Sequence, residues 1–122
     1  MNCIYTPSSK LLTLEITEEI DHHTAEKIRR RADYEIQRHM PRKTIFDFNS
    51  VTFMDSAGIG MIIGRYKMAA NFGGTLEIVN VKPSIKRILE MSGIFKLVEI
   101  KENIVNEKFV WKWNETRIFE QI

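Results

Sequence analysis

The chain has 122 residues and a mass of 14.3 kDa, the size of a single domain that can bury a hydrophobic core. Its net charge of +2 is too small to indicate nucleic-acid binding, and its one cysteine, Cys3, excludes an internal disulfide. No apolar run is long enough to cross a bilayer, and the N-terminus does not resemble a signal peptide. We therefore expect one cytoplasmic domain over residues 1–122, with its core at about residues 3–100.

The first half of the chain predicts a strand, a helix and a second strand. Partial alternation of apolar residues predicts a strand over Lys10–Ile16. Apolar residues then recur at helical spacing: Ala25, Ile28, Ala32 and Ile36. This spacing predicts a helix that Asp21 caps and Pro41 ends. The run Lys43–Phe48 has the apolar character of a strand in the middle of a sheet.

The second half continues the alternation of helices and strands. A helix is expected after Ser56, ending near residues 71–74, and Thr75–Val81 predicts a core strand. Pro83 near the first turn and Gly93 past the end bound a further helix, and Phe95–Ile100 predicts a last strand. The alternation indicates an α/β fold with a mixed, partly parallel sheet of roughly four to five strands.

The C-terminal segment, residues 101–122, has a different pattern. Three aromatic residues occur at every second position: Phe109, Trp111 and Trp113. This alternation favours a strand or an extended segment over a helix. We expect these aromatic side chains to cover the core rather than to form a partner site.

The stretch FMDSAGIGMIIGRYK (Phe53–Lys67) combines helical spacing with three glycines. A helical wheel predicts a core face of Ile59, Ile62, Ile63, Tyr66, Ala69 and Ala70. The opposite face comprises Ala57, Gly60, Met61, Gly64 and Met68, with Arg65 and Lys67 on its flanks. Each interior glycine costs a helix roughly 1 kcal/mol relative to alanine. We therefore expect another body to lie against this face, either another part of the domain or a second protein.

Ser56 is expected at the N-cap of this helix, directly after Asp55. Its side chain can serve simply as a cap for an unpaired backbone N–H. Alternatively, it can accept a phosphoryl group, whose negative charge the helix dipole would tolerate. The sequence alone leaves both roles open.

Catalytic, nucleotide and metal sites have little support in the sequence. The glycine spacing G-x-G-x-x-x-G differs from the dinucleotide fingerprint, and no P-loop or G-x-S-x-G motif occurs. His22 and His23 are adjacent and diverge around a helix, so a metal site is not expected there. We therefore expect no catalytic residues, no metal and no cofactor.

Four ordered blocks resemble bacterial anti-sigma factor antagonists, the STAS-domain proteins of the SpoIIAA and RsbV type. One block is the Phe53–Lys67 stretch, and the others are EIDHHTAE (Glu19–Glu26), IFDFNSVTFMDS (Ile45–Ser56) and KRILEMSGIFKLVEI (Lys86–Ile100). Together they cover most of residues 10–100. The DHHTA and GRYK segments look most like the sporulation branch, SpoIIAA.

The resemblance implies a mixed sheet with helices mainly on one face, and a regulator rather than an enzyme. In such families an anti-sigma factor that is also an ATP-dependent serine kinase phosphorylates the serine after the aspartate, here Ser56. The unphosphorylated protein binds this kinase and frees the sigma factor, and a phosphatase of the PP2C type restores it. Asp55 is implied as the positioning neighbour, and Ala57 leaves Ser56 as the single acceptor at this position.

The implied partner surface joins the turn before the first helix to the helix after Ser56. It comprises Asp21, His22, His23, Thr24, Asp55, Ser56, Ala57, Gly58, Gly60, Met61, Gly64, Arg65 and Met68. We expect a monomer that binds neither nucleic acid nor membrane. The alternatives are a STAS module of a phospho-regulated complex without a sigma factor, and weak nucleotide binding or hydrolysis by the domain itself.

Overall fold

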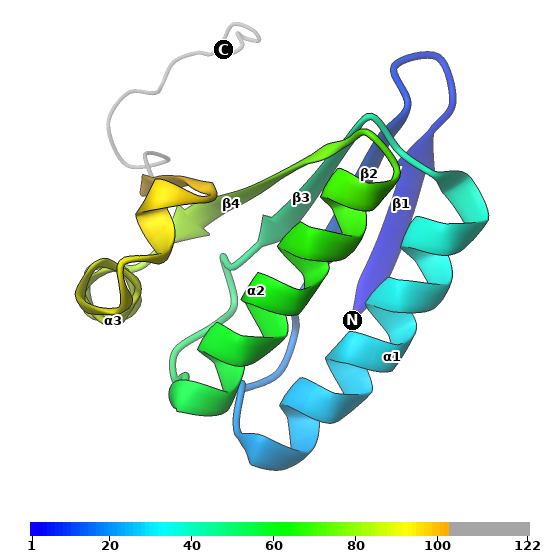
Figure 1. The fold of residues 1–122 in the computed structure, drawn as a ribbon. Helices are drawn as coiled ribbons and strands as arrows, with labels where there is room; N and C mark the ends of the chain where they lie inside the picture. The colour runs from blue at the N-terminus through cyan, green and yellow to red at the C-terminus, as the bar shows by residue number, and fades with distance from the viewer. Residues whose placement is uncertain (103–122) are drawn as a thin grey trace, which may run out of the picture.

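The computed structural model describes residues 1–102, and its elements alternate as the sequence predicts (Figure 1). They are β1 (Asn2–Thr6), β2 (Leu11–Glu15), α1 (His22–His39), β3 (Lys43–Asp47), α2 (Ser56–Asn71), β4 (Thr75–Val81), α3 (Pro83–Ser92), the 3-10 turn η1 (Ile94–Lys96) and β5 (Glu99–Glu102). The prediction for the aromatic tail lies outside the described residues. None of the described helices is long and apolar enough to cross a membrane.

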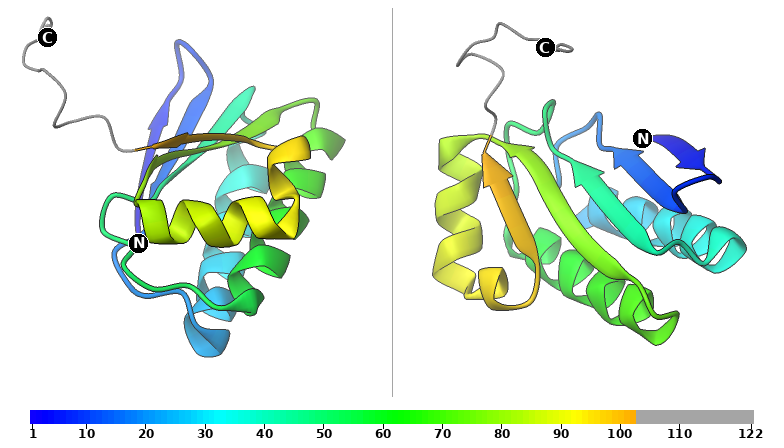
Figure 2. Two further views of the ribbon diagram at one scale, coloured as in Figure 1. Left: turned by 90° about the vertical axis from the view of Figure 1, so that its left-hand side faces the viewer. Right: turned by 90° about the horizontal axis from the view of Figure 1, so that it is seen from above.

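One five-stranded sheet organises the domain, with strand order β1-β2-β3-β4-β5. Only β1 is antiparallel to its neighbour, and the other three pairings are parallel. The three parallel connections, through α1, α2 and α3, all step in the same direction across the sheet. Right-handed crossovers therefore place the three helices on one face. Helices α1 and α2 lie side by side, and α3 lies near β5 (Figures 1 and 2). The predicted α/β architecture is confirmed.

The core lies between the sheet and its helices. Alternate residues of the central strands point into it, so that Leu14, Phe46 and Ile78 are paired neighbours across β2, β3 and β4. All three are fully buried. The predicted apolar stripe of α1 is also buried. The helix ends with Met40 in a left-handed conformation directly before Pro41.

The structure corrects the two ends of the predicted sheet. Strand β1 was not predicted, because none of its residues is fully buried and its apolar alternation is weak. The predicted last strand begins too early. Its first residues form the turn η1, which follows Gly93 in a left-handed conformation, and Leu97 N donates to Ile94 O. Strand β5 therefore starts only at Glu99.

An ion-paired carboxylate connects three strands on the sheet face opposite the core. Glu77 on β4 lies 3.2 Å from Lys43 Nζ on β3 and 2.7 Å from Lys101 Nζ on β5. Burial alone would raise the pKa of Glu77, but the hydrogen bonds from Lys101 and Lys43 outweigh it and hold the pKa below its ordinary value of 4.5. The group therefore stabilises the fold above pH 4.5, and this stabilisation is lost as the pH falls below that value.

We predict that Glu77→Gln lowers the free energy of unfolding at pH 7 by about 1 kcal/mol, because it removes one charge of this cluster. The difference from wild type should shrink between about pH 5 and pH 3, where wild-type Glu77 itself becomes protonated. Urea unfolding of both proteins across this range measures the effect. Glu99→Gln is the matched control, since Glu99 is exposed and lies 3.9 Å from the same lysine. A pH-independent difference would contradict the assignment.

Candidate functional site

A short parallel bridge between Ile20 and Met54 brings the two helix N-termini to one end of the molecule. Ile20 N donates to Phe53 O at 2.9 Å, and Asp55 N donates to Ile20 O at 3.0 Å. Both bridged side chains are buried. Because α1 starts two residues after Ile20 and α2 two residues after Met54, the bridge fixes where both helices begin.

The N-terminus of α1 is closed by a reciprocal cap. The Asp21 carboxylate accepts from His23 N and Thr24 N, each at 2.9 Å, and Thr24 Oγ1 accepts from Asp21 N at 2.8 Å. The hydrogen bond from Thr24 N is the main reason that the pKa of Asp21 is lowered. The predicted cap at Asp21 is confirmed, and His22 and His23 are exposed beside it.

Asp55, and not Ser56, is the N-cap of α2. Its backbone is extended, and its carboxylate accepts from Ala57 N at 2.8 Å. The predicted N-cap role of Ser56 is therefore wrong, because the residue before it already satisfies the free N–H. Ser56 is instead the first residue of the helix, and its side chain is exposed. Within residues 1–102 its hydroxyl forms no hydrogen bond.

The three glycines of α2 differ in how closely other atoms pack against them. A Cβ on Gly58 would lie 2.4 Å from Met54 Cγ and 3.1 Å from Ile20 Cγ2, so the first turn of α2 packs directly on the bridge. A Cβ on Gly60 or Gly64 would meet no atom within 4 Å. Of the three glycines in α2, only Gly58 is therefore required by packing against the rest of residues 1–102.

The buried faces of α2 differ from the predicted wheel. Ile62 and Ala69 are buried as expected, but Ala70 is exposed. Met61 and Arg65, which were assigned to the outer face and its flank, are also buried. The reason is that α2 packs against α1 as well as against the sheet, so its buried arc is wider than one stripe.

The remaining residues of the expected outer face are only partly free. Ala57 and Met68 are half-buried against the core, while Gly60 is exposed and Gly64 half-exposed. Packing within the domain therefore accounts for one side of this face, which lies on α1. The Gly60–Gly64 strip is uncovered within residues 1–102, and docking of a second protein there stays a prediction. Gly64 and Met68 lie roughly 12 and 18 Å along the helix from Ser56, so they are not brought to the end where the caps lie.

A groove separates the N-terminal halves of α1 and α2. It is a hollow of about 710 Å³, and its walls include both adjacent histidines, Ala57 and Gly60. Its charged lining comprises Glu26, Lys27, Arg29, Arg30 and Arg65.

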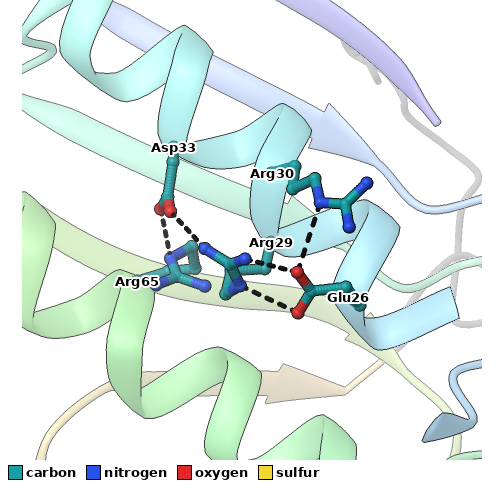
Figure 3. Close-up of polar contacts among 5 residues, drawn as sticks. All are labelled: Glu26, Arg29, Arg30, Asp33 and Arg65. Carbon is teal, nitrogen blue, oxygen red and sulfur yellow. Dashed lines mark hydrogen bonds and ion pairs between the residues drawn. The ribbon is translucent and has the colours of Figure 1, made fainter. Parts of the chain in front are cut away.

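An ion-pair network connects the two helices along this groove (Figure 3). Arg65 Nε of α2 lies 2.7 Å from Asp33 Oδ1 of α1, and Arg29 Nη1 lies 3.3 Å from Asp33 Oδ2. Arg29 also donates to the Glu26 carboxylate through Nε and Nη2, and Arg30 Nε lies 3.2 Å from the same carboxylate. Hydrogen bonding by Arg29 is the main reason that the pKa of Glu26 falls to about 2. Burial lowers the pKa of Arg65.

Phe53 belongs to this end of the molecule but was not among the predicted site residues. Its side chain is 47% exposed, although its carbonyl takes part in the bridge to Ile20. An exposed aromatic side chain three residues before the candidate phosphoacceptor is suited to protein contact. The sequence feature that could have identified Phe53 as a site residue is its position at the start of the glycine stretch. It lies there in a loop rather than in an apolar strand or helix.

The described residues 1–102 contain no group of three side chains that could hold a metal ion. The rings of His22 and His23 have their centres 5.5 Å apart and meet edge to face. The candidate site is therefore a partly basic surface around Ser56, at the capped N-termini of α1 and α2.

Comparison with known proteins agrees with this architecture. The STAS domain model matches residues 5–106. The chain belongs to the STAS domain family. It is 38% identical over 96 residues to the anti-sigma F factor antagonist of Paenibacillus polymyxa, covering 79% of this chain and 82% of that protein. The family resemblance seen in the sequence is thereby confirmed.

Two solved structures of SpoIIAA are also similar. The unphosphorylated form matches with a TM-score of 0.66 at 25% identity, over 75% of this chain and 80% of that chain. The phosphorylated form, described as the Bacillus cell fate determinant, matches with a TM-score of 0.59 at 25% identity, over 75% and 83% of the two chains. These similarities confirm the STAS fold.

We predict that Gly58→Ala destabilises the protein by about 1–3 kcal/mol, because the added methyl group overlaps Met54 beneath the first turn of α2. Gly60→Ala and Gly64→Ala are the matched controls on the same helix. Each should leave the stability unchanged or raise it by up to about 1 kcal/mol, because alanine favours the helix and meets open space. Urea unfolding measures all three variants. Equal stability of Gly58→Ala and wild type would contradict the packing argument.

Proposed function

We propose that this protein is an anti-sigma factor antagonist whose binding is switched by phosphorylation of Ser56. Unphosphorylated, it binds an anti-sigma factor that is also a serine kinase, and this binding releases the sigma factor. The observation that carries the proposal is the exposed Ser56 hydroxyl, which forms no hydrogen bond with any of residues 1–102 while Asp55 caps the helix.

The comparisons support this reading. The relative from Paenibacillus polymyxa is an anti-sigma F factor antagonist, and one structural neighbour is SpoIIAA in a phosphorylated form. Anti-sigma factor antagonists are regulatory proteins without enzymatic activity, which supports a protein that acts by binding. Its role as the substrate of a kinase is part of the proposal. We further propose that it works in the cytoplasm, as a monomer, in the control of sporulation. A PP2C-type phosphatase would reverse the modification.

The position of Ser56 suits a switch that leaves its own protein folded. A phosphoryl group there adds about −1.5 to −2 charge at the positive end of a helix dipole, which favours negative charge. The cap does not depend on the serine hydroxyl, because Ala57 N already donates to Asp55. The added charge therefore acts on whatever docks at this end of the molecule.

The proposed docking surface runs from this end along the uncovered strip of α2. Gly60 and Gly64 gain nothing from packing within the described part of the chain, yet each is disfavoured in a helix relative to alanine. A partner that approaches the backbone closely at these positions would explain both glycines. Exposed Phe53 and the Asp21–Thr24 cap border the same surface.

We predict that the purified kinase transfers one phosphoryl group from ATP to the wild-type protein and none to Ser56→Ala. Mass spectrometry of the intact protein and of its peptides locates the modification. Ser56→Asp should lose kinase binding, while its circular dichroism and melting temperature stay close to those of wild type. Labelling of another residue would refute the site. Binding and phosphorylation without release of a sigma factor would instead indicate a STAS module of a different signalling complex.

A second prediction separates binding from folding at the glycine strip. Gly60→Ala and Gly64→Ala should bind the kinase about tenfold more weakly, a loss of ~1.4 kcal/mol, although both are at least as stable as wild type. Calorimetric titration of each variant with the kinase measures the affinity. Ala70→Gly, at an exposed position near the C-terminal end of α2, is a control expected to bind normally. Unchanged binding of both glycine variants would remove this strip from the interface.

A further inference from the structure

The groove between α1 and α2 contains a buried positive charge with unsatisfied donors. Arg65 is only 7% exposed. Its Nε pairs with Asp33 without the geometry of a hydrogen bond, and its Nη1 has no acceptor within the described residues. A buried charged donor left without a partner costs about 1–3 kcal/mol or more. Such a group in an otherwise well-paired network calls for an acceptor from outside.

The surroundings of Arg65 carry excess positive charge. Arg29 and Arg65 both lie within 3.3 Å of the Asp33 carboxylate, so two guanidinium groups share one anion (Figure 3). Two further cations, Lys27 and Arg30, line the same groove. Among the described residues, the carboxylates that face these four positive groups are those of Glu26 and Asp33. The groove is therefore complementary to negative charge.

The direction of the proposed switch indicates the same chemistry. Ala57 lines the groove, so a phosphoryl group on the preceding Ser56 would sit at its rim. A negative charge at this rim would strengthen the binding of a cationic segment and weaken the binding of an acidic one. Loss of binding on phosphorylation therefore fits an acidic segment.

We propose that the α1–α2 groove receives an acidic segment of the kinase, with a carboxylate held by Arg65, Arg30 and Lys27. This inference rests on the proposed function and adds to it the chemistry of the partner. The uncovered strip at Gly60 forms one wall of the groove and lets the partner backbone approach the guanidinium groups. Phosphorylation then acts by repulsion between like charges, in addition to any steric effect.

Charge-reversal variants test this proposal. Arg30→Glu and Lys27→Glu change exposed side chains in the groove, and Arg38→Glu makes the same change on an exposed residue near the other end of α1. Affinity for the ADP-loaded kinase is measured between about 50 and 300 mM NaCl, across which screening becomes strong. Both groove variants should bind at least about tenfold more weakly and depend less on salt, whereas Arg38→Glu should bind within about twofold of wild type.

The possible outcomes separate this inference from the proposed function. Wild-type binding that neither groove variant weakens would overturn the acidic segment alone. Absence of wild-type binding and of Ser56 labelling would overturn both proposals. A titration of the free protein with sodium phosphate, followed by the Arg65 Nε–Hε signal in NMR spectra, provides a second arm. A phosphate-dependent shift together with normal kinase binding by both groove variants would assign the groove to a free anion and would also overturn the proposal.

Discussion

The backbone bridge between Ile20 and Met54 is the constraint on which the rest of the site depends. Two hydrogen bonds tie the loops that follow β2 and β3, and each loop then supplies the capping aspartate of the next helix. The bridge thereby sets the relative positions of α1 and α2, and with them the groove between the two helices. One short backbone bridge therefore positions the candidate phosphoacceptor Ser56, the capping residue Asp55 and the basic lining of the groove.

Neighbouring residues at the start of α2 have separate roles in this arrangement. Asp55 satisfies the helix terminus, and Gly58 permits the close contact with the bridge. The Ser56 hydroxyl between them has no hydrogen bond in the described part of the chain. A side chain that forms no stabilising contact can acquire a charge with little loss in the free energy of unfolding. This separation of roles is what would allow the proposed phosphorylation of Ser56 at a closely packed helix start.

Sequence patterns predicted the parts of the fold that depend on local periodicity or on local backbone chemistry. The α1 stripe, the Asp21 cap and the central strands follow from residue spacing alone. The burial of Met61 and Arg65 does not, because it depends on α2 having a second helix beside it. The Arg65–Asp33 pair joins residues far apart in the chain, so no local sequence pattern predicts it. Strand β1 was missed because an edge strand carries little apolar alternation. Strand β5 was predicted to start too early because the apolar residues before it form the turn η1.

Gly58 also has a consequence for genetic experiments on this protein. Under the proposed switch, a destabilising substitution at Gly58 removes the antagonist and leaves the sigma factor inhibited, whereas Ser56→Ala keeps the antagonist unphosphorylated and the sigma factor free. The two substitutions also differ in the amount of folded protein in the cell, which falls only for the first, because its defect lies under the helix rather than on its surface. Measuring protein abundance together with phenotype therefore distinguishes the packing role of Gly58 from the proposed switching role of Ser56.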